Sequence, residues 1–295
     1  MRAAFLGGGL VLAYTALISS ADAITKFIAQ SYAAPQLFAL SGMIVAALSL
    51  AAARGQAGRA LRTGCPRTMA TRAAATVAAS LCFFHAFRLL PFADVFVFVG
   101  LMPIVAAVMS SVMLREHPRP AAWAALLAGF VGLLCLMPGG VGTASSGHLW
   151  AVGGVLTGTF SLVLSRYIGR FETNALAQVF YPNLALGLSM SVALPFVWVP
   201  MPVADLAWVL AYAGLLFAAR WLLVVALRLL AAYVVTPLLN LQFVWMVGLG
   251  AWAFGEWPEP MTWLGVAIVM GSGLFLLWDQ VTPQRAAIWR ARTDP

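Results

Sequence analysis

Apolar and polar residues are distributed along this chain in long blocks, not at the short periods of a soluble fold. Apolar runs of membrane length are separated by turns that carry Pro, Gly or charge. A spanning helix needs about 20 apolar residues, because it rises about 1.5 Å per residue through a hydrocarbon core about 30 Å thick. The pattern predicts spans over residues 4–24, 35–53, 71–88, 92–114, 121–138, 148–168, 175–197, 205–227, 232–254 and 261–279.

These runs contain Gly, Ala and Pro without the alternation of barrel strands, so we predict an all-α membrane protein with ten transmembrane helices. Composition agrees with this prediction. The chain is 63% hydrophobic and 9% charged, whereas a soluble domain is about 25% charged. The formal charge of +8 would suggest nucleic acid in a soluble protein. Here it is explained by membrane topology, and we expect a lipid bilayer and no nucleic-acid partner.

One stretch of the chain occurs twice. Residues 88–123 align with residues 228–263 at a constant offset of 140 without a gap. Apolar composition could supply the Leu and Val matches, but it cannot easily supply a shared E-x-P-x-P-x-x-W pattern in register with R-L-L. ITKFIA (24–29) also faces LSRYIG (164–169) at this offset. We predict two five-helix repeats, residues 1–140 and 141–283, followed by a basic tail at 284–295.

The distribution of charge indicates that the two repeats are inverted. Five spans per repeat is an odd number, so the second copy enters the membrane from the opposite side. With a cytoplasmic N-terminus, every Lys and Arg except Lys26, Arg88 and Arg220 falls on the cytoplasmic side, including Arg72 in the arginine-rich 54–72 stretch. This bias fits the positive-inside rule. We therefore predict an inner (plasma) membrane protein with both termini in the cytoplasm.

These motifs resemble the drug/metabolite transporter superfamily with two EamA-type domains. The resemblance rests on an A-L-R type motif before a span that ends in an acidic, Pro-containing turn. It occurs as Ala86-Phe87-Arg88 with Glu116, and as Ala226-Leu227-Arg228 with Glu256. S-x-D-A-x-x-K at residues 20–26 and N-L-Q-F-V-W at residues 240–245 are similar to the branch that carries S-adenosylmethionine-type and vitamin solutes. The chain departs from that branch at residues 38–41.

Polar groups inside a bilayer are costly and are therefore functional candidates. Asp22 and Lys26 are four residues apart on one helix face. They form either a coupling or substrate-contacting pair or a structural ion pair at the interface. The repeat favours a role for Asp22, because its counterpart is Leu162, whereas the counterpart of Lys26 is the basic Arg166.

Further candidates lie beside prolines, because a proline inside a helix frees a carbonyl that a side chain or a substrate can use. Asn240 and Gln242 follow Pro237, and Trp245 could share the face of Gln242. Tyr181 and Asn183 flank Pro182 in a similar arrangement. Interhelical hydrogen bonding is the alternative role for these side chains.

Arg220 lies within a span that holds no other charge between residues 207 and 225, so it must pair or face water. Asp22 or an anionic group of the solute could be its partner. We counted Arg220 among the substrate-binding candidates, with Asn240, Gln242, Trp245, Tyr181 and Asn183.

These observations favour a secondary-active carrier of a small organic metabolite, working by alternating access, with proton coupling as a hypothesis. The resemblance implies an amino-acid-derived, nucleoside-like or vitamin-like solute, such as S-adenosylmethionine or riboflavin. An exporter of a metabolite or toxic compound and a non-transporting scaffold are the alternatives. The chain lacks G-x-x-x-x-G-K-[ST], H-E-x-x-H and G-x-S-x-G, and its three cysteines have no C-x-x-C spacing. We therefore expect no enzyme activity, cofactor or metal, and a monomer or homodimer.

Overall fold

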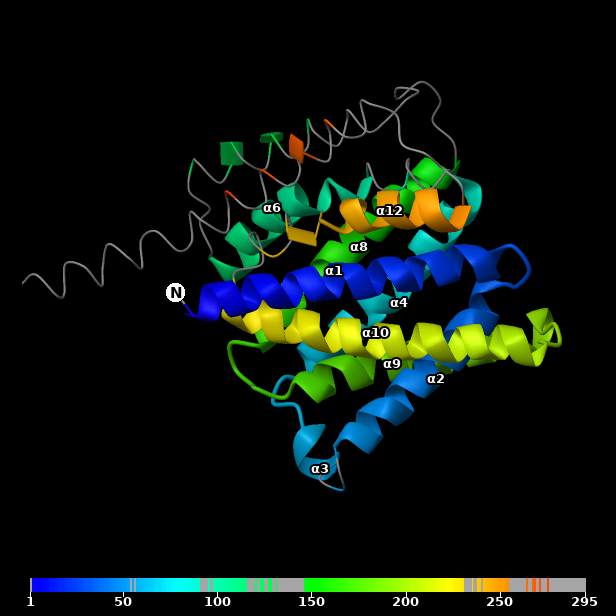
Figure 1. Cartoon of the computed structure of the whole chain (residues 1–295). Helices are drawn as coiled ribbons and strands as arrows, with labels where there is room; N and C mark the ends of the chain where they lie inside the picture. Colours follow the sequence, from blue (N-terminus) through cyan, green and yellow to red (C-terminus); the bar gives the residue numbers. More distant parts are fainter. Residues whose placement is uncertain are drawn as a thin grey trace, which may run out of the picture.

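The computed structural model of the protein describes residues 2–90 except 54 and 56, residues 98–115, 146–230 and 241–254, and single positions outside these ranges. The regular structure in these ranges is helical (Figure 1). The helices are α1 (Arg2–Ala29), α2 (Ala34–Ala52), α3 (Ala57–Ala60), α4 (Pro66–Leu89), α6 (Met102–Leu114), α8 (Ser146–Ile168), α9 (Ala175–Val197), α10 (Val203–Leu229) and α12 (Gln242–Phe254).

Six of these helices, α1, α2, α4, α8, α9 and α10, are long and apolar enough to cross a membrane. Large apolar side chains face outward from them. Phe196 is 88% exposed and Val192 is 74% exposed, as expected of a surface that faces lipid. The prediction of an all-helical membrane protein is confirmed. The spans predicted over residues 121–138 and 261–279 lie outside the described residues, apart from single positions.

Helix boundaries agree with the hydropathy pattern except where a span starts with charge or contains a break. α9 covers the predicted residues 175–197. α4 starts with Pro66, five residues before the predicted start, so Arg67 and Arg72 lie within the helix and not in the loop. The span predicted over 92–114 is not continuous. Residues 100 and 101 form a turn, and α6 begins at Met102 with Pro103 in its first turn, where a missing N–H costs little.

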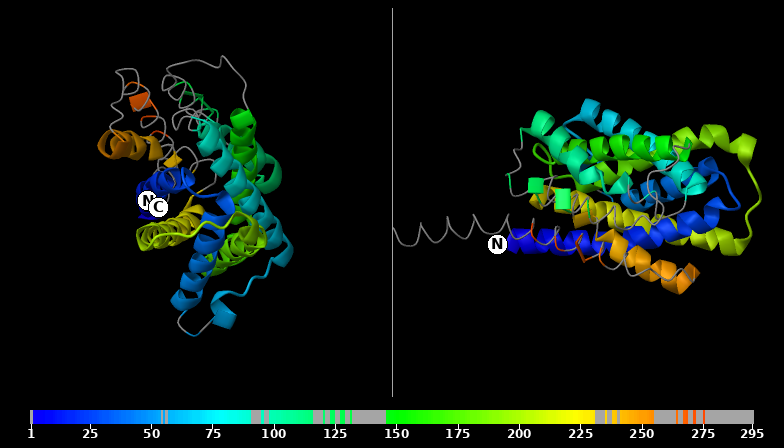
Figure 2. Two further views of the ribbon diagram at one scale, coloured as in Figure 1. Left: turned by 90° about the vertical axis from the view of Figure 1, so that its right-hand side faces the viewer. Right: turned by 90° about the horizontal axis from the view of Figure 1, so that it is seen from above.

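Three pairs of long helices pack side by side: α1 with α10, α2 with α9, and α4 with α8. The views in Figures 1 and 2 show α1 beside α10 along most of its length. Small residues permit the closest approach between α2 and α9. A Cβ atom on Gly42 would lie 2.7 Å from the backbone nitrogen of Gly187 and 2.8 Å from the carbonyl oxygen of Asn183.

Contacts in one part of the bundle recur 140 residues later. A Cβ on Gly7 in α1 would meet Leu230 at 2.7 Å, and a Cβ on Gly147 in α8 would meet Leu90 at 2.6 Å. Leu90 and Leu230 end α4 and α10 in the same way, each with an extended backbone and an N–H donated to a carbonyl four residues earlier. The helices α6 and α12 also start at positions 140 residues apart.

Side-chain hydrogen bonds join loops at both ends of the bundle. At one end Tyr32 donates to Asp205 (2.5 Å), and the amide of Gln36 exchanges two hydrogen bonds with the backbone of Val199 (2.6 and 3.0 Å). The hydrogen bond to Asp205 raises the pKa of the Tyr32 phenol, so the phenol stays a donor at neutral pH.

At the other end, the carboxylate of Glu172 accepts hydrogen bonds from the Gly64 N–H (2.6 Å) and the Thr63 hydroxyl (3.1 Å). Asn174 donates to the carbonyls of Arg59 (3.3 Å) and Arg62 (2.6 Å). Arg59 and Val199 are 140 residues apart, as are Tyr32 and Glu172. Each end is therefore fastened at corresponding places in the two halves.

We expect Gln36→Leu to destabilise the protein, because it leaves the N–H and C=O of Val199 without their partner. Unsatisfied buried groups cost about 1–3 kcal/mol, which lowers the melting temperature in detergent by several degrees. Gln30→Leu is the matched control, since Gln30 lies at the same end of the bundle and is exposed. Equal melting temperatures for the two variants would contradict a stabilising role for the Gln36 contacts.

Candidate functional site

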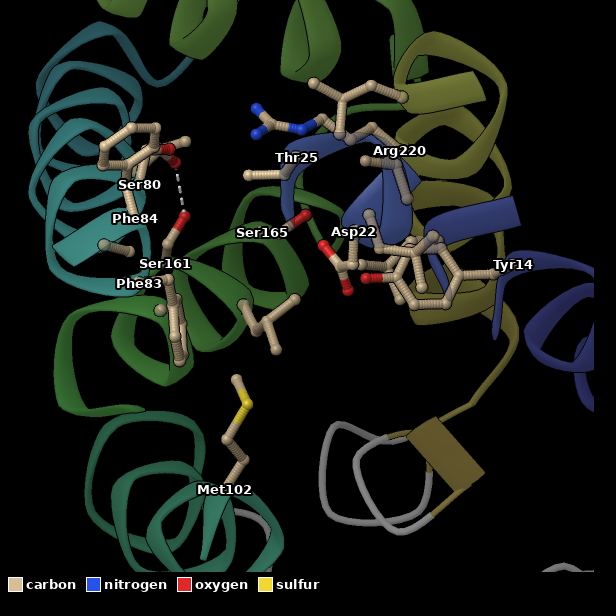
Figure 3. Close-up of a pocket in the computed structure, with 18 of the residues that line it drawn as sticks. Tyr14, Asp22, Thr25, Ser80, Phe83, Phe84, Met102, Ser161, Ser165 and Arg220 are labelled. Carbon is tan, nitrogen blue, oxygen red and sulfur yellow. Dashed lines mark hydrogen bonds between the residues drawn. The ribbon is translucent and has the colours of Figure 1, made fainter. Parts of the chain in front are cut away.

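A cavity of about 230 Å³ lies inside the bundle, between α1, α2, α4, α6, α8 and α10. Figure 3 shows Asp22 and Tyr14 reaching it from α1 and Arg220 from α10. Ser161 and Ser165 of α8 lie opposite, and Met102 points toward the same space from α6. Helices from both predicted repeats therefore surround one internal space that holds charged and hydroxyl groups.

Most residues that line this cavity occur in pairs separated by 140 positions. The pairs are Ile18/Gly158, Asp22/Leu162, Thr25/Ser165, Arg72/Tyr212, Thr76/Leu216, Ser80/Arg220, Phe83/Leu223, Phe84/Val224 and Phe87/Leu227. The two halves thus contribute the same backbone positions to the cavity. The side chains differ within most pairs, so the chemistry of the cavity is asymmetric although its framework is duplicated.

Asp22 is held by a residue from a distant part of the chain. The Gln242 side-chain amide donates to the Asp22 carboxylate at 2.7 Å. Thr15, Ser19 and Asp22 form one polar face of α1, because their spacings of four and three residues place them on the same side of the helix. Ser19 donates to the Gln242 carbonyl (3.3 Å), and Trp245 donates from its indole to Thr15 (3.2 Å). This face therefore attaches the start of α12 to the helix that carries Asp22.

Arg72 lies at the cavity and not in the cytoplasmic loop where the charge pattern placed it. It is 9% exposed and donates from Nη1 to the carbonyl of Gln178. That carbonyl is available because Pro182, four residues later in α9, has no N–H to donate to it. The proline frees a carbonyl as the sequence suggested, but a buried arginine uses it.

Arg220 has a different environment. No ion pair joins it to Asp22, and no hydrogen bond joins its guanidinium to another residue that the structure describes. Figure 3 shows this guanidinium extending from α10 into the cavity. A guanidinium group inside a membrane protein needs an anion, hydrogen-bond acceptors or water. Arg220 is therefore the group most available to a solute.

Aromatic rings cover the α4 side of the cavity. Phe83, Phe84 and Phe87 come from α4 and Phe38 from α2. Phe38 and Phe84 pack edge to face with ring centroids 5.7 Å apart, a preferred aromatic geometry. The positions on α10 that correspond to Phe83, Phe84 and Phe87 hold Leu or Val. One wall is thus aromatic and the facing wall is aliphatic.

Hydroxyl groups complete the lining. The hydroxyls of Thr76 and Ser161 lie 2.8 Å apart, which joins α4 to α8. Ser165 donates to the side-chain carbonyl of Gln178 at 2.6 Å. Within the described residues, no group of three or more His, Cys, Asp or Glu side chains is placed to hold a metal ion. The arrangement offers charge, hydroxyls and aromatic faces to a small organic molecule.

The structure brings some of the predicted site residues together and separates others. Asp22 and Arg220 line the cavity, and Gln242 and Trp245 contact the polar face of α1 behind it. Lys26 is partly buried and is not part of the lining; its counterpart Arg166 donates to the Leu227 carbonyl at 2.6 Å near the end of α10. Asn240 lies outside the described residues.

Tyr181 and Asn183 in α9 are not part of the cavity lining. Tyr181 packs beside the buried Met69, Ile168 and Ala177. Asn183 is fully buried and donates to the carbonyl of Val179 at 2.7 Å, within its own helix. Both side chains thus contact the helix packing around α9 and not the central space.

Sequence reasoning did not select Arg72, Tyr212, Thr25, Ser165 or the phenylalanines of α4. The offset of 140 is the signal that could have found several of them. Applied to Arg220 it points to Ser80, and from there the neighbouring turns of α4 give Thr76 and Phe83. Arg72 was hidden because its charge was attributed to topology.

An all-helical membrane bundle with a polar, partly aromatic cavity defines a membrane protein with an internal binding space. Residues 6–137 match the EamA-like transporter family, and this part of the chain is an EamA-like transporter domain. The resemblance drawn from the motifs is therefore confirmed.

Two similar proteins are named riboflavin transporter. One from Rhizobium johnstonii is 29% identical over 185 residues, which cover 62% of this chain and 61% of that protein. One from Vibrio cholerae is 26% identical over 186 residues, which cover 62% of each. The matches thus span about three fifths of these relatives. A crystal structure aligns with 92% of this chain and 96% of its own chain, with a TM-score of 0.76 and 21% identity, which supports the fold.

Proposed function

We propose that this protein is a secondary-active carrier of a small organic metabolite and that the cavity around Asp22 and Arg220 is its solute site. The observation that carries this proposal is the cavity itself, which is built from corresponding positions of two halves. Solute sites of inverted-repeat carriers lie at the interface of the repeats near the middle of the membrane. The EamA-like domain supports the same conclusion.

The proposed architecture has ten spans in two inverted five-helix repeats, residues 1–140 and 141–283, with a basic tail at 284–295. The recurring Gly–Leu contacts and the corresponding loop fastenings at the two ends of the bundle support it. In an inverted repeat, equivalent elements lie on opposite sides of the membrane. Rocking of one repeat against the other would then expose the cavity to each side in turn.

Within this scheme Asp22 is the proposed coupling residue. It is an ionisable group at the cavity, and Gln242 connects it to α12. A change in its protonation would alter a hydrogen bond that joins two helices, so proton uptake could bias which side of the cavity is open. Riboflavin, named for the two relatives, belongs to the class of vitamin-like solutes that we propose.

The carrier function is tested with proteoliposomes incubated in a deproteinised metabolite extract. We expect saturable accumulation of one or a few solutes, measured by mass spectrometry, and acceleration of their exit by the same solutes outside. Protein-free liposomes are the control. A protein that behaves like empty liposomes would be a scaffold and not a carrier.

Topology gives a separate prediction. Cys65 directly precedes α4 and is partly exposed, and we propose that both termini and this loop face the cytoplasm of the inner (plasma) membrane. An impermeant maleimide should therefore spare Cys65 in intact cells and label it in inverted vesicles. Cys65→Ser identifies the labelled residue. Labelling of Cys65 from outside intact cells would reverse the proposed orientation.

A further inference from the structure

The charges at the cavity are unequal in number and in availability. Asp22 contributes one carboxylate, and one of its oxygens already accepts a hydrogen bond from Gln242. Arg72 and Arg220 contribute two guanidinium groups. Arg72 is engaged by the carbonyl of Gln178, whereas Arg220 has no hydrogen bond to a described residue. The cavity therefore has a formal excess of positive charge, and one arginine is free to bind a ligand.

An unpaired guanidinium group is costly in a low-dielectric interior, and an anion of fitting geometry relieves that cost. Its planar fork of N–H donors suits carboxylate and phosphate oxygens, which it binds in pairs. Ser80 occupies the position in α4 that corresponds to Arg220 in α10. The duplicated framework does not require an arginine there, so this residue reflects a need of one half only.

The aromatic wall indicates what the rest of the ligand is. Phe83, Phe84 and Phe87 lie on α4, and the same positions on α10 are Leu223, Val224 and Leu227. Aliphatic side chains thus fit the framework at these positions. Aromatic faces add offset or edge-to-face contacts with a planar ring, beyond simple burial. The rings are opposite the helix that carries Arg220, so one molecule can contact both.

The volume limits the size of the ligand. About 230 Å³ is below the roughly 300–1,000 Å³ typical of sites for drug-sized ligands. A molecule with one or two rings fits this space better than a three-ring flavin with its ribityl chain.

We propose that the solute is a small organic anion with one or two aromatic rings, whose carboxylate or phosphate binds Arg220 and whose ring packs on the phenylalanine wall of α4. This inference rests on the proposed carrier function and narrows its substrate class. It separates this chain from relatives named for riboflavin, which is larger and uncharged at neutral pH.

The first test compares matched probes on the wild-type protein. 2-Naphthoate, 2-naphthyl phosphate, the uncharged 2-naphthamide and the saturated decalin-2-carboxylate differ in charge or aromaticity at similar size. A ligand that binds the native state raises the melting temperature in proportion to its affinity. We expect one of the aromatic anions to bind about tenfold or more tightly than the amide and the saturated acid. Equal or tighter binding of the amide or riboflavin would overturn the proposal.

Variants then assign the two contacts. Arg220→Gln should remove the preference for the anion over the amide, and Arg67→Gln, which removes an exposed arginine of α4, should keep it. Phe83→Leu with Phe87→Leu introduces the residue types found at the corresponding α10 positions. This variant should lose the preference for the aromatic acid over the saturated acid and still prefer anions. Unchanged preferences in both cavity variants would also overturn the proposal.

Counterflow keeps this result distinct from the carrier function. If proteoliposomes accumulate a neutral metabolite from the extract and no aromatic anion competes, the carrier function holds and the anion inference fails. If the aromatic anions bind and exchange, both hold. If the protein accumulates no metabolite and binds none of the probes, both fail.

Discussion

Asp22→Asn is expected to abolish solute accumulation driven by a pH gradient while solute exchange continues. Asparagine keeps the shape of the side chain, and its carbonyl can still accept the hydrogen bond that Gln242 donates at 2.7 Å. It cannot take up or release a proton, so the energetic link between proton and solute is lost. Accumulation ratios should fall to those reached without a pH gradient, and counterflow should stay within about twofold, since hydrogen bonding is retained.

Proteoliposomes measure both quantities on one preparation, with an imposed pH gradient for accumulation and equal pH for counterflow. Asp205→Asn is the matched control, because Asp205 lies in the first turn of α10, away from the cavity lining, and accepts from Tyr32. An Asp22→Asn carrier that still concentrates solute on the gradient would exclude coupling through Asp22. A general loss of folded protein would instead assign Asp22 a structural role.

Gln242→Ala separates the hydrogen bond from the proton. It leaves the Asp22 carboxylate without this donor and removes one attachment of α12 to α1. Hydrogen bonds to charged groups contribute about 1.5–3 kcal/mol, so we expect transport to fall about tenfold or more, at equal pH as well as on a gradient. Full transport by Gln242→Ala would show that the attachment of α12 to Asp22 is not required.

The second large effect is expected at the crossing of α2 and α9. Gly42→Ala places a Cβ 2.7 Å from a backbone nitrogen and 2.8 Å from a carbonyl oxygen of α9, and backbone atoms cannot turn aside as a flexible side chain can. The helices must separate, which costs about 1–3 kcal/mol as overpacking. This cost opposes and exceeds the gain of up to about 1 kcal/mol that alanine brings to a helix. Gly42→Leu should prevent folding.

Gly214→Ala is the control for this prediction, because a Cβ at Gly214 in α10 would meet nothing within 4 Å. It should raise the melting temperature slightly, whereas Gly42→Ala should lower it by several degrees. Thermal unfolding in detergent gives both values. A Gly42→Ala protein as stable as Gly214→Ala would mean that the backbones at this crossing are not in close contact.

The helices themselves could be predicted from the sequence because their causes are local. A run of apolar residues must satisfy its own backbone hydrogen bonds in lipid, so residues 175–197 form a helix whatever their neighbours are. The duplicated stretch also predicted equivalent helix starts, as Met102 and Gln242 show. Asp22, Gln242 and Arg220 were selected because polar groups in such runs are rare and costly.

The environment of each polar group was decided only by tertiary structure. A charge pattern cannot tell whether Arg72 faces cytoplasm or a cavity, since an arginine near the end of a span satisfies both; the free carbonyl of Gln178 in another helix decides it. Pro182 freed that carbonyl, but nothing local assigned it to Arg72 and not to Asn183. The partner of Asp22 is Gln242, and not Lys26 or Arg220, because packing of α12 on α1 joins residues 220 positions apart.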